Sequence, residues 1–179
     1  AANLSNLRIG IPENFFFDGI EDAVATAFTR ANEKLTQAGA RLIRFRLPVV
    51  EDYIAANAKG GFAAAEAHAW HKDLLAEHGA IYDPRVRVRI ERGAGQSAAD
   101  YIELRDARRA VITRANQATQ DFDVLMTPTT PILPPPIAAL DDEGEYTRVN
   151  LLSLRNPAIF NFLDRCAISL PCHAPGEAP

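Results

Sequence analysis

The sequence predicts an α/β fold, and three consecutive segments near its start carry that prediction. Leu7 to Pro12, "LRIGIP", is a short apolar run that ends at a proline, as a buried strand does. The stretch between Asp18 and Gly39 has apolar residues at helical spacing. Residues 41–48, "RLIRFRLP", alternate apolar and basic side chains. Strand, helix and strand within about forty residues form a βαβ-like unit, which favours an α/β layer fold.

The helix of this unit has signals at both ends. Asp18 with Glu21 three residues later resembles a capping box, and Gly39 stands where a helix C-cap glycine belongs. Its apolar stripe consists of Val24, Phe28, Ala31 and Leu35. In the strand that follows, Ile43, Phe45 and Leu47 alternate with arginines. This period of two predicts one solvated face and a place near a sheet edge.

The middle of the chain is mainly helical. Residues 51–78 are alanine-rich, are interrupted by Gly60 and Gly61, and end at Gly79. Residues 83–93, "DPRVRVRIERG", fit either of two structures: their alternating valines suit a strand, whereas Pro84 suits a helix start.

A clearer helix begins after Ser97. Ser97 with Asp100 looks like a capping box. One face of this helix is apolar except for an arginine; it consists of Tyr101, Leu104, Arg108, Val111, Ala115, Ala118 and Phe122. The helix leads into a predicted strand over residues 123–127, and this strand runs directly into a corner rich in threonine and proline.

The last third of the chain continues with a long proline- and acid-rich loop, predicted over residues 128–150. Loops of this length in compact domains are usually functional or disordered. A short helix over residues 151–162 and a final apolar strand, "AISLP", follow. Because no internal repeat and no linker interrupts the pattern, we expect residues 1–179 to form one domain.

Composition excludes several classes of function. The net charge is −4, whereas binding to nucleic acid needs a basic face, so we expect no direct nucleic-acid partner. No stretch approaches the ~18 apolar residues of a membrane span, and the first residues do not resemble a signal peptide. The two cysteines, Cys166 and Cys172, fit a reducing, cytoplasmic compartment.

No complete catalytic set is apparent, so we predict no catalytic residue in this chain. None of the four serines stands in a glycine-rich turn of the G-x-S-x-G kind, and Ser97 is better explained as a helix cap. Cys172 and His173 are adjacent, so on a strand they would point to opposite faces, an objection that weakens if the strand has already ended there. We therefore do not expect any of these serines, or the Cys172–His173 pair, to act as a catalytic nucleophile.

A metal site is also not expected. The histidines of the alanine-rich segment, His68, His71 and His78, lack the H-E-x-x-H pattern and an evident third ligand, and Trp70 between them suits a solvated helix face. No cofactor motif is present either, so neither metal nor cofactor is predicted.

The arginine-rich segment has two interpretations. Arg85, Arg87, Arg89 and Arg92 lie within eight residues, and the plainer interpretation is a solvated face balanced by acids. The alternative is that one of them points inward and binds a carboxylate through a two-pronged hydrogen bond, which lysine cannot match. Arg89 is the candidate for that role.

Together the motifs resemble the C-terminal half of the amidase signature family, which includes the A subunit of tRNA-dependent amidotransferases. The resemblance rests on "DVLMTPTTP" at residues 123–131, on the preceding helix with "YIELRDARRAVI", and on "RNPAIFNFLDRCAISLPC" at residues 155–172, with Asn161 as the helix asparagine. "LRIGIPENFF" resembles the strand that follows the family's catalytic core. The resemblance covers essentially the whole chain.

The resemblance implies an amide hydrolase whose α/β/α sandwich surrounds a mixed sheet. In the family, a nucleophilic serine, a bridging serine on a cis peptide and a lysine base precede the "LRIGIP" strand. Lys34, Lys59 and Lys72 match none of those positions, so the resemblance implies that the triad is absent from this chain. The chain is then the C-terminal segment of an amidase signature domain, and its sheet is incomplete without the catalytic core.

What remains for this chain is the wall of the substrate cleft. By resemblance, Arg89 aligns with an arginine that holds the substrate's carboxylate, and Gly61 lies in another cleft segment. Thr129 and Thr130 belong to the proline corner, which either forms one lip of the cleft or merely ends a strand. Asn156, with Arg155, occupies a region where some relatives carry an acid for the substrate amine. Because no acid matches here, the resemblance favours a general amidase or a carboxylated, urea-type substrate over glutamine or asparagine.

Two functional hypotheses follow. In the first, the chain supplies scaffold and cleft wall to an enzyme that hydrolyses a small-molecule amide, and it is inactive alone. In the second, it is a non-catalytic binding or assembly module. The first predicts that the isolated chain associates with itself or needs the missing catalytic segment, because a face built to pack against that segment leaves an apolar patch.

Overall fold

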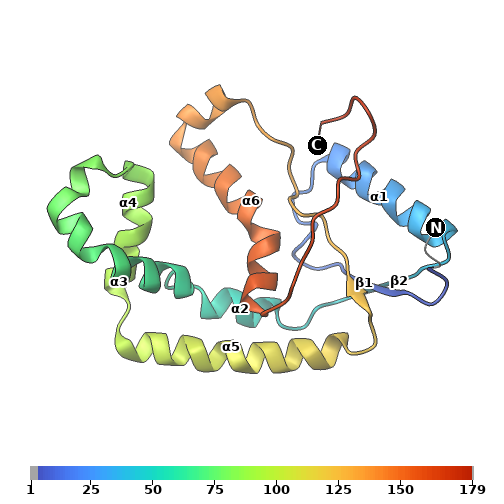
Figure 1. Cartoon of the computed structure of the whole chain (residues 1–179), viewed down its shortest axis with the longest axis horizontal. Coiled ribbons are helices and arrows are strands. Elements are labelled where there is room, and N and C mark those ends of the chain that lie inside the picture. Colours follow the sequence, from blue (N-terminus) through green and yellow to red (C-terminus); the bar gives the residue numbers. More distant parts are fainter. Residues whose placement is uncertain (1–3, 179) are drawn as a thin grey trace. The chain divides into compact units, whose positions relative to one another are not determined.

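A parallel three-stranded sheet organises one part of the chain. The computed structural model describes residues 4–178. The central strand is β1 (Arg8–Pro12), and it pairs with β2 (Arg41–Phe45) on one side and with β3 (Val124–Leu125) on the other. Both pairings are parallel, so the carboxyl ends of β1 and β3 lie at the same edge of the sheet (Figure 1).

The chain divides into two compact units. One consists of residues 1–50 and 114–179, and the other of residues 51–113. We call them the sheet unit and the helical unit and describe each by itself. The single domain expected over residues 1–179 stays a prediction.

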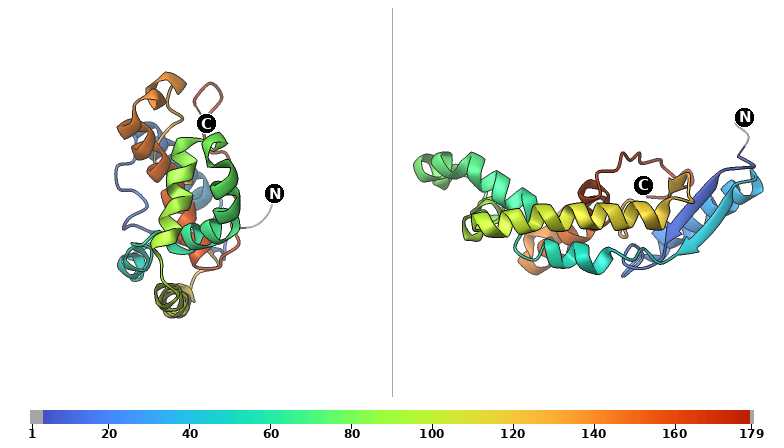
Figure 2. Two further views of the ribbon diagram at one scale, coloured as in Figure 1. Left: turned by 90° about the vertical axis from the view of Figure 1, so that its left-hand side faces the viewer. Right: turned by 90° about the horizontal axis from the view of Figure 1, so that it is seen from below.

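The predicted βαβ unit is confirmed. α1 (Asp22–Gln37) connects β1 to β2 and packs against β2 (Figure 2). Gly39, with φ of 97°, takes the left-handed conformation that follows a helix end, as predicted. The capping box was wrong: the helix begins at Asp22, and Glu21 is its N-cap residue without a side-chain cap bond. The carboxylate of Glu21 instead accepts a hydrogen bond from the Leu133 amide.

β2 is an edge strand, as predicted. The predicted alternation of buried and exposed side chains along it is wrong. Ile43 was expected on the buried face, yet 43% of it is exposed. Phe45 is half-buried and packs on the ring of Phe122 with the ring centroids 4.7 Å apart. The prediction failed because an edge strand buries only those side chains that another element covers, and the alternation alone does not identify them.

Gly10 in the middle of β1 is required by its neighbours. A Cβ on Gly10 would lie 2.6 Å from the ring of Phe122 and 2.9 Å from Leu125. The glycine therefore allows Phe122, in the turn after α5, and strand β3 to approach the central strand.

Beyond the sheet, the sheet unit contains η3 (Ile137–Asp141) and α6 (Glu143–Phe162). α6 begins earlier than the predicted residue 151, because Asp142 accepts a hydrogen bond from the Glu145 amide and caps a first turn that lies within the predicted loop. The buried apolar side chains of this unit are Ile9, Ile11, Phe16, Ala27, Phe28, Ala40, Leu47, Val49, Val50, Ala115, Ile132, Val149, Ile159, Phe162 and Leu163.

Two predicted strands differ from the structure. The strand expected over residues 123–127 is only the two residues of β3, and Val124 is 48% exposed. Residues 167–171 form no strand; Ile168 and Leu170 are 82% and 72% exposed. A strand needs a partner for its backbone groups, and the described residues supply none for this segment.

The helical unit resolves the ambiguous segment as a helix. Asp83 caps α4 by accepting hydrogen bonds from the amides of Arg85 and Val86, and Pro84 opens it. The break at Gly60–Gly61 and the helix end at Gly79 are confirmed. The unit's elements are α2 (Val50–Ala56), α3 (Gly61–His78), η1 (Gly79–Ile81), α4 (Pro84–Glu91), η2 (Arg92–Gly95) and the greater part of α5 (Ala98–Thr119).

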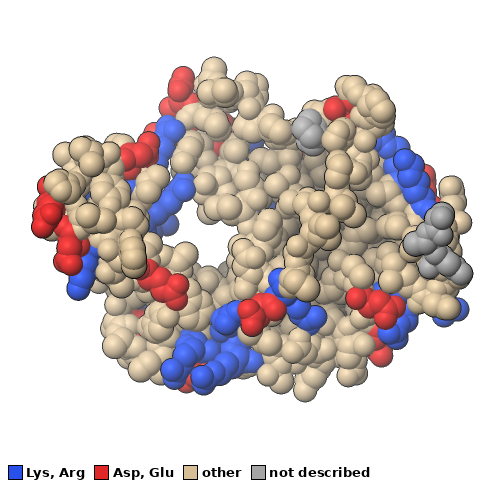
Figure 3. All heavy atoms as spheres, in the orientation of Figure 1, with Lys and Arg blue, Asp and Glu red and all other residues tan. Residues whose placement is uncertain are grey.

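The surface carries charges of both signs. On the face shown in Figure 3, basic and acidic side chains lie close to one another on each unit. Among the described helices, none is long and apolar enough to cross a membrane. Cys166 and Cys172 are exposed free thiols. The expected absence of a nucleic-acid partner and the cytoplasmic location both stay predictions.

Candidate functional site

The proline corner lies where β3 ends. The chain passes from Leu125 into residues 127–131 at the carboxyl edge of the parallel sheet. At the same edge, β1 leads into the loop of residues 13–20. In open α/β sheets, ligands bind outside the carboxyl ends of the strands, so this edge is the candidate site of the sheet unit.

The corner cannot be held by its own backbone. Prolines have no N–H group, and five of the nine residues 128–136, which comprise the corner and the residues after it, are prolines, so more than half of the local backbone donors are missing. Donors come from other elements instead. The Glu21 amide donates to the Pro131 carbonyl at 2.8 Å, and the Asn156 amide group donates to the Pro128 carbonyl at 2.8 Å. The start of α1 and the middle of α6 therefore fix the two ends of the corner.

The two threonines of the corner behave differently. Thr130 is half-buried, and its hydroxyl donates to the Ile132 carbonyl at 3.1 Å, as expected for a hydroxyl that satisfies the corner's backbone. Thr129 is exposed, and its hydroxyl lies 2.8 Å from the hydroxyl of Ser169. Thr129 is thus the hydroxyl that the corner presents outward. Contact of either threonine with a substrate stays a prediction.

Asn156 lies beneath the corner. It is 1% exposed, and its amide nitrogen donates to the carbonyls of Phe16 at 3.0 Å and Pro128 at 2.8 Å. Its side-chain oxygen accepts from Arg155 Nε at 3.1 Å. Because both amide hydrogens are used, the structure assigns Asn156 to holding the corner, and direct contact with a substrate stays a prediction. Asn161, the other asparagine of this helix, is exposed.

Arg155 binds the loop that follows β1. Its guanidinium donates to the carbonyl of Asp18 at 2.6 Å and to that of Phe16 at 3.1 Å, and it lies 5.3 Å from the centre of the Phe15 ring. Partial burial lowers the pKa of Arg155 below its ordinary value, while the charge of Asp18 opposes that shift. At this position the structure places a cation that is held by two backbone carbonyls.

Gly61 and Arg89, the other two predicted site residues, lie in the helical unit. Gly60 and Gly61 have φ of 101° and 64°, so both need the left-handed conformation that glycine adopts readily. The side-chain amide of Gln96 donates to the carbonyls of Lys59 at 2.8 Å and Gly61 at 3.0 Å. This turn is therefore fixed onto the segment that precedes α5.

The start of α5 is fixed by the predicted capping box. The hydroxyl of Ser97 accepts from the Asp100 amide at 3.1 Å, and the Asp100 carboxylate accepts from the Ser97 amide at 2.8 Å. Asp100 also pairs with Lys59, and this hydrogen bond, together with those from Ser97, holds the pKa of Asp100 well below its ordinary value. Ser97 is a helix cap, as the sequence indicated.

Arg89 lies in the last turn of α4 and is half-buried. Arg89 directly precedes Ile90, which is buried. Arg87, in contrast, is exposed and pairs with Glu91 at 2.7 Å. Arg89 thus differs in burial from its exposed neighbour. Its role as a carboxylate clamp stays a prediction.

A polar and aromatic cluster on the helical unit was not predicted. The hydroxyl of Tyr101 donates to the Glu66 carboxylate at 3.0 Å, and this bond raises the pKa of Tyr101. The ring of Phe62 meets that of Tyr101 edge to face, and the guanidinium of Arg108 lies 5.9 Å from the centre of the Phe62 ring. The sequence did contain a signal, because an arginine interrupted the apolar stripe of α5 at position 108.

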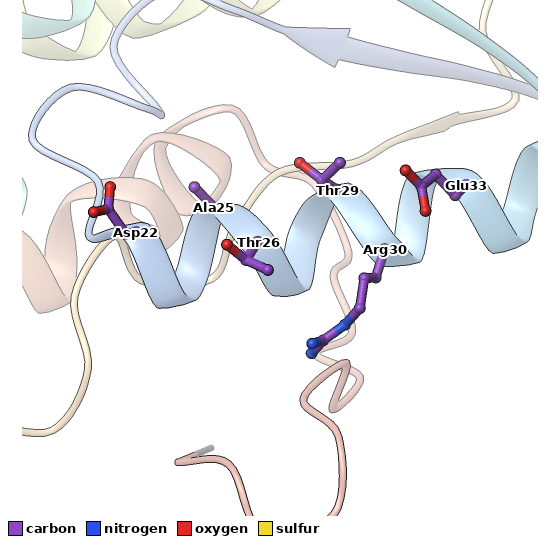
Figure 4. A pocket seen from close by; sticks show the side chains of 6 residues that line it. All are labelled: Asp22, Ala25, Thr26, Thr29, Arg30 and Glu33. Atoms are coloured by element: carbon purple, nitrogen blue, oxygen red, sulfur yellow. The ribbon is translucent and has the colours of Figure 1, made fainter.

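Two further features are separate from the site. A hollow of about 570 Å³ runs along α1, and Figure 4 shows its lining side chains on successive turns of that single helix.

Among the histidines, His71 Nδ1 lies 2.8 Å from the Tyr82 hydroxyl. Within residues 4–178, no group of three metal-ligating side chains is placed to hold a metal ion.

Comparison with known proteins decides the family. A family model described as Amidase matches residues 1–177. The chain belongs to the Amidase family. The resemblance stated from the sequence motifs is therefore confirmed.

Curated relatives of this amidase chain match it over most of its length. It is 35% identical over 172 residues to 2-amino-5-chloromuconic acid deaminase of Comamonas testosteroni and 33% identical over 175 residues to an amidase of Pseudomonas putida. Each match covers 94% of this chain and 36% of the relative. The chain thus spans about a third of the length of these relatives.

Solved structures confirm the fold class. Allophanate hydrolase of Kluyveromyces lactis superposes with a TM-score of 0.78 at 23% identity, covering 89% of this chain and 26% of the hydrolase. A crystal structure described as an amidase gives 0.72 at 24% identity and covers 90% of this chain and 37% of that one. The amidase signature fold and the α/β class are thereby established for this chain. The three strands described here are all parallel.

Proposed function

We propose that this chain supplies the scaffold and one wall of the substrate cleft to an amide-hydrolysing enzyme. The observation that supports the proposal best is the rigid corner at the carboxyl edge of the sheet, in a chain that belongs to the Amidase family. The reactive groups, a nucleophilic serine, a bridging serine and a lysine base, lie outside this chain under the proposal. The chain alone is then inactive and is the C-terminal segment of the domain.

Three of the four serines of this chain support that division of labour. Ser97 caps α5, and Ser169 bonds to Thr129 across the corner. Ser153 lies inside α6. The three lysines include Lys59, which pairs with Asp100 rather than with a serine. These arrangements suit structural hydroxyls and a surface ammonium, not a serine activated by a base.

For the substrate, we propose a small amide that carries a carboxylate. The Comamonas relative is named for an acid, 2-amino-5-chloromuconic acid. Arg89 provides a fork of donors suited to a carboxylate, and Arg155 is a cation in the region where an ammonium would need an acid. A glutamine-like substrate with a free ammonium is therefore disfavoured.

The test of the division of labour uses the isolated chain. We expect no turnover of simple amides and no covalent labelling by a serine-directed fluorophosphonate, read by intact-mass spectrometry. An enzyme in which this chain is joined to a serine- and lysine-bearing catalytic core should be labelled once, on the core. Labelling of any of the chain's own four serines would overturn the proposal.

The test of the substrate class compares Arg89→Lys with Arg87→Lys in that joined enzyme. Arg89→Lys keeps the charge but loses the fork, so kcat/KM for a carboxylated amide should fall on the order of tenfold, while a neutral amide of equal size is unaffected. Arg87→Lys, at an exposed ion pair, should change neither. An equal loss for both amides would show that Arg89 holds no carboxylate.

We also propose that the isolated chain associates with itself. The sheet unit exposes several large apolar side chains, among them Val124, Ile137, Leu151, Leu154, Ile168 and Leu170. Exposed apolar surface of this kind marks contact faces when it is contiguous. Sedimentation velocity at several concentrations should show oligomers; a concentration-independent monomer with a sharp melting transition would favour an independent binding module.

A further inference from the structure

The two loops at the carboxyl edge of the sheet are joined by one buried side chain. Asn156 donates one amide hydrogen to the Phe16 carbonyl, in the loop after β1, and the other to the Pro128 carbonyl, in the corner after β3. Both bonds are buried. The end of the first loop also bonds to the corner directly, through the Glu21 amide and the Pro131 carbonyl, so the amide group of Asn156 is a second, buried bridge at the Pro128 end of the corner.

Arg155 extends the bridge to the rest of the first loop. Its guanidinium reaches the carbonyls of Phe16 and Asp18, and its Nε donates to the side-chain oxygen of Asn156. That last bond fixes the orientation of the amide, because the oxygen must face Arg155 and the two hydrogens must then face the loops. An amide turned the other way would place its hydrogens against a cation.

The first loop depends on external support. Phe15 has φ of 74°, a left-handed conformation that is strained for a residue with a bulky side chain. Such a conformation persists only where its surroundings hold it. Phe16 packs against Phe160 of α6 with the ring centroids 5.4 Å apart, and the guanidinium of Arg155 lies over the ring of Phe15. The helix that carries Asn156 therefore also holds this loop in place.

We propose that Arg155 and Asn156 act as a positioning pair that couples the loop after β1 to the corner after β3, so that a disturbance of one loop loosens the other. Neither residue needs to touch the substrate. The consequence for catalysis rests on the proposed function, because it assumes that the corner lines the cleft. The coupling itself does not rest on that function and can be tested on the chain alone.

The decisive variant is Arg155→Lys, with hydrogen exchange measured by mass spectrometry on the full chain. The described hydrogen bonds and ring contact of Arg155 go to residues 15, 16, 18 and 156, and none of them goes to the corner. A merely local role would speed exchange only in peptides covering residues 14–20, which end before Glu21, the residue whose amide bonds to the corner. Coupling predicts faster exchange, on the order of tenfold, in peptides covering residues 127–133 as well. Arg148→Lys, at an exposed ion pair with Glu145 on the same helix, is the matched control and should leave both regions unchanged.

Asn156→Ala removes the bridge directly and should loosen both loops more strongly. If that variant fails to fold, Arg155→Lys still tests the coupling of the two loops, because it leaves the buried amide of Asn156 in place. Faster exchange confined to residues 14–20 in Arg155→Lys would refute the coupling.

In the joined enzyme, Arg155→Lys should lower kcat more than it raises KM, since loosened loops misplace a substrate that still binds. A wild-type enzyme without amide turnover would defeat the proposed function and leave the exchange result standing. Coupled exchange together with unchanged kcat would show that the corner does not serve the cleft.

Discussion

Replacing Gly61 with alanine tests how the turn between α2 and α3 is held. Gly61 has φ of 64°, and placing an alanine in that left-handed conformation costs roughly 1–2 kcal/mol. The added Cβ would also overlap the side-chain oxygen of Asn57. Asn57 would have to rotate and give up its hydrogen bond to the Tyr53 carbonyl, now 2.8 Å long, at a cost of about 0.5–1.5 kcal/mol. The free energy of unfolding should therefore fall by about 1.5–3.5 kcal/mol.

The assay is urea unfolding at one fixed protein concentration, because association makes the apparent stability depend on concentration. Gly95→Ala is the matched control: no atom lies within 4 Å of its added Cβ, and Gly95 is not among the glycines with positive φ. That variant should stay within about 0.5 kcal/mol of the wild type.

The double variant separates the two costs. If Asn57 is the obstacle, then Asn57→Ala combined with Gly61→Ala should destabilise by less than the sum of the single changes, by about 1 kcal/mol. Additive changes would assign the whole cost to the backbone. If Gly61→Ala proved as mild as Gly95→Ala, the described turn would be incorrect.

Three further outcomes follow. Hydrogen bonds from Arg8 lower the pKa of Asp123 to about 2. The ionised Asp123 therefore stabilises the fold above its unfolded pKa of about 3.9, and this contribution is lost as the pH falls toward 2. Asp123→Asn should flatten that part of a plot of melting temperature against pH. Gly93→Ala would drive a Cβ into the backbone carbonyl of Ala64, which cannot rotate away. The free energy of unfolding, measured in urea, should therefore fall by an amount near the upper end of about 1–3 kcal/mol. Ile159→Ala empties a fully buried position and should cost about 2–5 kcal/mol, whereas the same change at the exposed Leu151 should cost less than about 0.5 kcal/mol; equal effects would contradict the described core.

Local signals in the sequence identified the elements whose ends are set by neighbouring residues. The glycine turn at Gly60–Gly61 and the cap at Ser97 were predicted because their partners lie within a few positions along the chain. The segment from Pro84 shows the limit of periodicity. Its alternating Val86 and Val88 suited a strand, yet both are exposed, and the cap and proline at the helix start decided the structure.

The strand predictions failed for a different reason. Strand formation depends on a partner, and the pairing of β3 with β1 involves residues distant in sequence. Residues 167–171 have the composition of a strand, but within residues 4–178 no strand pairs with them. Composition can show that a segment is able to form a strand, and only the fold shows whether its backbone groups find partners.

The candidate site also contains features that are visible in the local sequence and contacts that exist only in the folded chain. The local pattern of hydroxyls and prolines drew attention to the threonines of the corner, and their place in the cleft is a prediction from the resemblance. Asn156 was found only by resemblance, and its position beneath the corner could not be predicted, because Phe16 and Pro128 come near it only in the folded chain. Glu21 was expected to cap its own helix and instead bonds to the corner.

The proline corner and the buried asparagine are two parts of one arrangement. Each proline that stiffens the corner also removes a backbone donor, so the corner's carbonyls and its few amides need partners from elsewhere. Asn156 and Glu21 supply those partners at opposite ends of residues 128–133. A proline-rich corner at the carboxyl end of a strand therefore implies a buried donor on a distant element. In this chain that donor also bonds to the loop after β1, which is why stiffness of the corner and placement of the loop should change together.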